Sequence, residues 1–213
     1  MSERRLPFFL LIDTSGSMRG EAIESVNNGL QVLLSSLRRD PYALESVHIS
    51  IITFDTEAKE LFPLTPLDEV QLPEITVPSS GATFLGAALE LLIQRFDRDV
   101  KHTTDDSKGD WRPILFVMTD GSPSDTYAYQ MMVSEVKKRS FGNIVVCAAG
   151  PKAKIEVLKE LTDTVVHLET VDSSAFASFF KWVSASVSMG SSSAGVAEPT
   201  LLPPPPPEVQ VVL

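Results

Sequence analysis

The sequence is poor in the residues that build disulfides and thiolate sites. It has 213 residues but a single cysteine, Cys147, and only three histidines. One cysteine excludes an internal disulfide and a Cys-x-x-Cys metal or redox site. Cys147 lies in the apolar run Asn143 to Ala148, which is typical of a buried side chain. This cysteine usage fits a reducing compartment, and we expect a cytoplasmic location.

Basic residues are also scarce. Lys and Arg total 18 against 28 Asp and Glu, which gives a net charge of -10. Nucleic acids and anionic lipids are bound by clustered cations, so neither is an expected partner. The apolar run Phe8 to Ile12 is too short for a signal peptide, and none approaches the roughly 20 residues of a membrane span. With 43% hydrophobic residues, the chain is expected to form one soluble globular domain.

Apolar runs alternate with segments of helical period, as in a mostly parallel sheet with crossover helices. Only three residues, Asp55 to Glu57, separate the second and third runs, so these two must form an antiparallel hairpin. The sequence predicts an α/β fold with six strands, one of them an antiparallel edge strand, and helices on both faces. The predicted strands are 8–12, 48–54, 58–62, 114–118, 144–148 and 165–168, and the predicted helices begin near Glu21 and Leu85 and around residues 127–139, 152–161 and 172–187.

The composition changes near Ser188, where a Gly- and Ser-rich stretch precedes the prolines 203–207. We therefore expect a domain over residues 1–187 and a flexible tail over 188–213, whose deletion leaves stability unchanged. Residues 208–213 could form a strand if given an edge. The tail could dock on a partner or on a second copy, and Glu208 could complete a metal site in that copy.

Polar side chains follow the predicted strands at the carboxyl edge of the sheet, where α/β folds bind ligands. Asp13, Ser15 and Ser17 follow the first strand, Asp120 follows the strand that ends at Met118, and Thr83 precedes the second crossover helix. Oxygen ligands of this kind suit Mg²⁺ or Mn²⁺ better than zinc, which prefers His and Cys.

The pattern Asp-x-Ser-x-Ser with a later Thr and Asp resembles the metal-ion-dependent adhesion site (MIDAS) of von Willebrand factor A (vWA) domains. The resemblance covers about residues 6–187 and implies a Rossmann-like fold that binds a protein partner through a divalent metal. It implies that Ser15 and Ser17 ligate the metal directly and that Thr83 does so directly or through water. Asp13 and Asp120 would hold coordinated waters and the serine hydroxyls. An acidic side chain of the partner would complete the coordination.

Within that superfamily, residues 6–18 and 116–125 resemble the bacterial TerY-like proteins of tellurium-resistance loci. This closer resemblance implies a role in a stress-response complex. A protein kinase and a PP2C-type phosphatase are the partners that it implies.

An enzyme is the main alternative, because an aspartate after the first strand also occurs in Mg²⁺-dependent aspartyl-phosphate phosphohydrolases. In such an enzyme Asp13 would be the nucleophile, but the second carboxylate is replaced by Ser15 and no leaving-group acid is placed. Neither a P-loop nor GxGxxG or GxSxG occurs. Asp13 to Ser17 could also be only a helix cap, and Asp120-Gly121 only a turn. The sequence favours a binding module over an enzyme.

Overall fold

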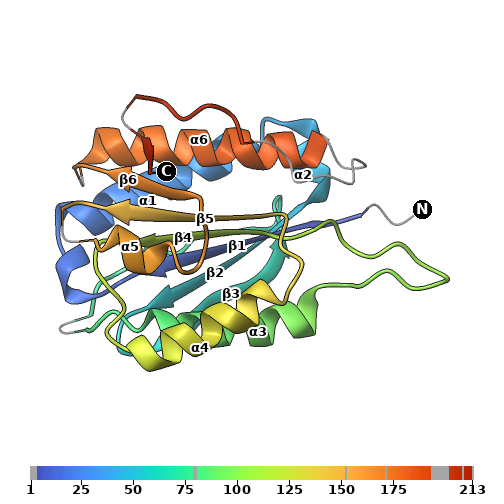
Figure 1. The fold of residues 1–213 in the computed structure, drawn as a ribbon. Helices are drawn as coiled ribbons and strands as arrows, with labels where there is room; N and C mark the ends of the chain where they lie inside the picture. Colours follow the sequence, from blue (N-terminus) through green and yellow to red (C-terminus); the bar gives the residue numbers. More distant parts are fainter. Residues whose placement is uncertain are drawn as a thin grey trace.

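The computed structural model describes residues 4–78, 81–151, 153–170, 172–192, 202–207 and 209–212, with side-chain surroundings in the last helix up to residue 189. In this part of the chain seven strands form one sheet, in the order β3-β2-β1-β4-β5-β6-β7. Helices cover both faces of the sheet (Figure 1). The strands are β1 (Leu6–Asp13), β2 (Val47–Phe54), β3 (Ala58–Pro66), β4 (Ile114–Thr119), β5 (Asn143–Ala149), β6 (Val165–Leu168) and β7 (Gln210–Val212). The helices are α1 (Glu21–Leu37), α2 (Pro41–Ser46), α3 (Leu85–Asp99), α4 (Thr126–Lys137), α5 (Ile155–Leu158) and α6 (Ser173–Ser192).

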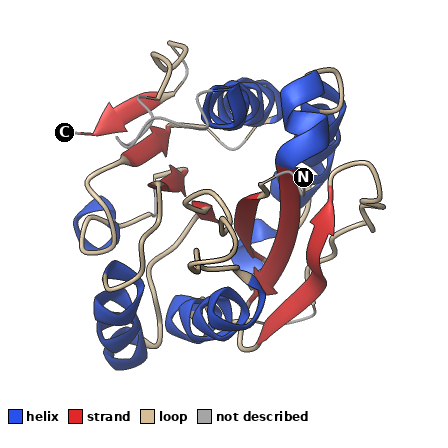
Figure 2. Cartoon of the chain, turned by 90° about the vertical axis from the view of Figure 1, so that its right-hand side faces the viewer, coloured by secondary structure: helices blue, strands red, loops and turns tan. Residues whose placement is uncertain are grey.

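Five neighbouring strands, from β2 through β6, run parallel, so their carboxyl ends meet at one edge of the sheet. β3 pairs antiparallel with β2, which confirms the predicted hairpin. β7 pairs antiparallel with β6 at the other side of the sheet (Figure 2). The predicted α/β fold is confirmed. The expected six strands are corrected to seven described strands, and the single expected antiparallel edge strand is corrected to two, β3 and β7.

The central strand β1 is buried along its whole length because helices lie on both of its faces. Its side chains alternate between two apolar clusters: Phe8 and Leu10 join one, and Phe9 and Leu11 join the other. The first cluster lies under α1 and α6, and the second under α3, α4 and α5 (Figure 1). Among the described residues, no helix combines the length and apolarity needed to span a bilayer.

Two helices differ from the sequence expectation. The helix expected at 152–161 is only the short α5. The short α2 was not expected, because six residues are too few to show a helical stripe. Local residues define the start of α2. Asp40 is the N-cap and accepts hydrogen bonds from the amides of Tyr42 and Ala43, and Pro41 is the first residue of the helix.

The described part of the predicted tail packs against the sheet and α6. α6 continues past the expected end near residue 187 to Ser192. Trp182 Nε1 donates a hydrogen bond to the carbonyl oxygen of Pro203 at 2.8 Å, and Val209 is 2% exposed within the core. Among the described strands β6 has no other neighbour on this side, so β7 satisfies backbone groups that a bare edge would leave open. Glu208, proposed to act on a second copy, lies outside the described residues.

The close packing of α1 against α6 leaves no room for a side chain at Gly29. A Cβ added to Gly29 of α1 would lie 2.1 Å from Cδ2 of Phe180, a fully buried residue of α6. Gly29→Ala gains about 1 kcal/mol of helix propensity but overpacks the core, so we expect a net loss of about 1–2 kcal/mol in unfolding free energy. Urea denaturation measures it, with Asn28→Ala as the control that gains propensity without the clash. Equal or higher stability of Gly29→Ala would show that Phe180 has room to move.

Candidate metal centre

Asp13 lies at the carboxyl end of β1 and is fully buried. One carboxylate oxygen, Oδ1, accepts the amide of Ser15 at 2.7 Å, and Oδ2 accepts the hydroxyl of Thr119 at 2.6 Å. Burial raises the pKa of Asp13 to about 6 and the negative charge of Asp120 acts in the same direction, although the hydrogen bonds oppose both. Asp13 therefore carries a carboxylate that lacks a cationic partner among these contacts and is costly to ionise.

The two predicted serine ligands lie side by side. Ser15 Oγ and Ser17 Oγ are 3.2 Å apart, and Ser17 donates a hydrogen bond to Asp120 Oδ1 at 2.8 Å. Ser15 is buried and Ser17 is exposed, so the two hydroxyls lie at the protein surface, between the interior and solvent. The loops after β1 and β4, more than 100 residues apart in the chain, are thus joined through oxygen atoms, which is the arrangement that a cation site needs.

Thr83 lies on the loop that leads into α3, next to the other two loops. Its side-chain oxygen is 3.2 Å from the position that a Cβ on Gly121 would take, so a side chain there would crowd Thr83. The amide of Gly16 donates to the carbonyl oxygen of Gly81 at 3.2 Å, which holds the Thr83 loop against the loop after β1. The hydroxyl of Thr83 makes no hydrogen bond to the described residues. The structure therefore brings all five sequence-predicted residues, Asp13, Ser15, Ser17, Thr83 and Asp120, to one place.

Sequence reasoning missed two side chains that support this arrangement. Thr119 links the two predicted loops, because its hydroxyl donates to Asp13 and accepts the amide of Gly121 at 3.2 Å. Asp55 is 8% exposed and accepts the hydroxyl of Thr14 at 3.2 Å. Both residues lie at the carboxyl end of a strand. That position was the only feature of the sequence that could have indicated their role in the site.

The chemistry of the donors fits a hard divalent cation. In an octahedron with bonds of about 2.1 Å, neighbouring oxygens lie about 3 Å apart. The 3.2 Å between the hydroxyl oxygens of Ser15 and Ser17 matches that spacing. No group of three or more His, Cys, Asp or Glu side chains in the described residues could hold a metal. The candidate donors at this edge are the hydroxyls of Ser15, Ser17 and Thr83 and the carboxylates of Asp13 and Asp120.

A comparison with models of known protein families shows to which family the chain belongs. Residues 9–181 match the model of the von Willebrand factor type A domain. The chain belongs to that family. The expected vWA fold is thereby confirmed. A search of curated proteins gives no match.

Solved structures with this fold come from distant proteins. The vWA protein of Catenulispora acidiphila aligns with a TM-score of 0.67 and 14% identity over 87% of this chain and 43% of its own. Proximal thread matrix protein 1 of the mussel byssus aligns with a TM-score of 0.66 and 16% identity over 86% and 48%. Another structure of the mussel protein has zinc in its MIDAS motif. The chain thus spans less than half the length of these proteins, and the likeness shows the fold.

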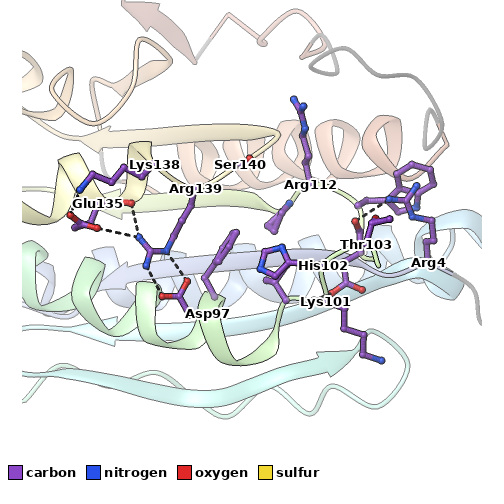
Figure 3. A pocket seen from close by; sticks show the side chains of 15 residues that line it. Arg4, Asp97, Lys101, His102, Thr103, Arg112, Glu135, Lys138, Arg139 and Ser140 are labelled. Carbon is purple, nitrogen blue, oxygen red and sulfur yellow. Dashed lines mark hydrogen bonds and ion pairs between the residues drawn. The ribbon is translucent and has the colours of Figure 1, made fainter. Parts of the chain in front are cut away.

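A cavity of about 620 Å³ lies at the opposite end of the sheet, between the segments that precede β1 and β4 and the ends of α3 and α4. On one side Arg139 is paired with Asp97, with an Nε–Oδ1 distance of 2.9 Å (Figure 3). Lys101 and Arg112 extend in opposite directions, away from His102 (Figure 3). Among the lining residues, charged groups do not converge on one point, so the cavity is a poor candidate for chemistry.

Proposed function

We propose that this vWA domain is a metal-dependent protein-interaction module. Asp13, Ser15, Ser17, Thr83 and Asp120 would hold Mg²⁺ or Mn²⁺, and the metal would take an acidic side chain of a protein partner. The observation that carries the proposal is the paired hydroxyls of Ser15 and Ser17, held 3.2 Å apart beside Asp120 at the carboxyl edge of the sheet. Family membership supports the same function, because vWA domains are generally interaction modules.

The donor set explains why the partner's residue should be acidic. Hydroxyls are neutral ligands, so a divalent ion held by Ser15 and Ser17 keeps much of its positive charge. The carboxylates of Asp13 and Asp120 accept hydrogen bonds from the Ser15 amide and the Ser17 hydroxyl and so orient this loop. A carboxylate from outside then supplies both a hard oxygen ligand and the missing negative charge.

The closer resemblance of residues 6–18 and 116–125 to TerY-like proteins supports a more specific proposal. The domain would act in a bacterial tellurium- or stress-resistance complex in the cytoplasm, with a protein kinase and a PP2C-type phosphatase as partners. Capture of partners from the native host with Mg²⁺, and their loss with a chelator, tests it. Replacement of an acidic residue of a captured partner should abolish its binding.

Metal binding itself is tested by thermal unfolding. A ligand that binds only the folded state at ten times its Kd adds about 1.4 kcal/mol, so Mg²⁺ or Mn²⁺ should raise the Tm by a few degrees. Asp120→Ala should abolish this shift, because it removes the acceptor of the Ser17 hydroxyl. Asp105→Ala, in an exposed loop, is the matched control and should keep the shift. A full shift in Asp120→Ala would contradict the assignment.

A further inference from the structure

The loop after β4 reaches across to the Thr83 loop through Ser124. The amide of Ser124 donates to the carbonyl oxygen of Thr83 at 2.8 Å, and the amide of Thr83 donates to Ser124 Oγ at 3.3 Å. These two bonds fix the backbone of Thr83 on both sides of its Cα. Because the Thr83 hydroxyl has no hydrogen bond within the described chain, its place is set by the backbone that Ser124 holds.

The next residue, Asp125, holds the start of α3. Its Oδ1 accepts the amide of Gly86 at 3.1 Å, and its Oδ2 accepts the amide of Ala87 at 2.9 Å. The helix's own N-cap residue, Phe84, supplies no side-chain cap, so Asp125 satisfies amides that α3 leaves open. A Cβ on Gly86 would lie 2.4 Å from the backbone nitrogen of Tyr129, so α3 and α4 meet backbone to backbone here.

We propose that Ser124 and Asp125 are positioning residues that hold Thr83 at the metal. The inference rests on the proposed metal site and names two residues outside its five ligand positions. Asp120 and the Ser124–Asp125 pair belong to one loop, so this loop sets two parts of the site at once: the acceptor of Ser17 and the backbone of Thr83.

The test is the affinity for Mn²⁺, followed by electron paramagnetic resonance, which also measures weak binding. Loss of a residue that orients a metal ligand costs about 10- to 100-fold in affinity, and we expect about 10-fold for Ser124→Ala. The side chain of Ser124 is exposed, so the fold should persist. Ser124→Thr keeps the hydroxyl and should restore the affinity. Ser122→Ala, in the same loop but without these bonds, should bind as the wild type does.

Asp125→Ala provides the second variant. It leaves the amides of Gly86 and Ala87 unpaired, so we expect weaker Mn²⁺ binding together with a lower Tm of the metal-free protein. A lower Tm with unchanged Mn²⁺ affinity would show that Asp125 only stabilises the fold and would overturn its positioning role.

A double-mutant cycle with Thr83→Ala separates positioning from other effects. If Ser124 acts through Thr83, then Ser124→Ala causes no further loss of Mn²⁺ affinity once Thr83 is alanine. The same 10-fold loss in both backgrounds would overturn the inference, and so would an unchanged affinity in Ser124→Ala alone. Absence of Mn²⁺ binding by the wild type would instead defeat the proposed function.

Discussion

Deletion of residues 193–213 is expected to lower the Tm by about 10 °C. The deletion removes β7, so the backbone groups of β6 that pair with residues 210–212 lose their partners. It also removes Val209, whose full burial contributes about 1.5–3 kcal/mol, and the acceptor of Trp182 Nε1. Together these losses amount to about 3–5 kcal/mol, and in a chain of this size each kcal/mol shifts the Tm by about 2–4 °C.

Calorimetry of the truncated and full-length proteins measures this effect. Two full-length variants separate packing from chain length: Val209→Ser should lose part of the stability, whereas Pro204→Ser, at an exposed position, should lose little. A truncated protein that melts within about a degree of the full-length protein would contradict the placement of β7 in the sheet. That outcome would restore the expectation of a flexible tail.

The place of the tail shows what sequence patterns cannot determine. Alternation in the last residues indicated a strand that needed an edge, and this local property was correctly predicted. Which edge it joins depends on β6 lying at the side of the sheet and on Trp182 facing Pro203, 21 residues away in the chain. Both follow from tertiary packing, and a proline-rich composition points to a flexible segment instead.

The candidate metal centre was easier to predict for a physical reason. Parallel strands bring their carboxyl ends to one edge, so Asp13 and Asp120 could be placed at the same edge from the predicted parallel sheet alone, and the structure adds that β1 and β4 are neighbours. The bonds from Thr119 to Asp13 and from Ser124 to Thr83 could not, because they depend on the side-chain and backbone geometry of loops that lie far apart in the chain. The complete burial of Asp13 was also beyond sequence reasoning, and it is the main cause of the raised pKa of this carboxyl.

Asp13→Asn is expected to stabilise the metal-free protein at pH 7 while it abolishes stabilisation by Mg²⁺. The pKa of Asp13 is raised from 3.8 to about 6, chiefly by burial. At about 1.4 kcal/mol per pKa unit, ionised Asp13 costs the fold about 3 kcal/mol. Asparagine removes this charge and still offers an oxygen to the Ser15 amide, and the hydroxyl of Thr119 can turn to accept from the new amide group.

The pH dependence identifies Asp13 as the cause. Because the folded protein holds this proton more tightly than the unfolded chain, the wild type in chelator should lose stability as pH rises from about 4 to about 6. Urea denaturation across this range should show a shallower decline for Asp13→Asn, so the two proteins diverge until about pH 6 and then stay apart. Asp68→Asn, an exposed acid, should follow the wild type. If metal-free Asp13→Asn is the less stable protein at pH 7, the hydrogen bonds that Asp13 accepts outweigh the cost of burying its charge.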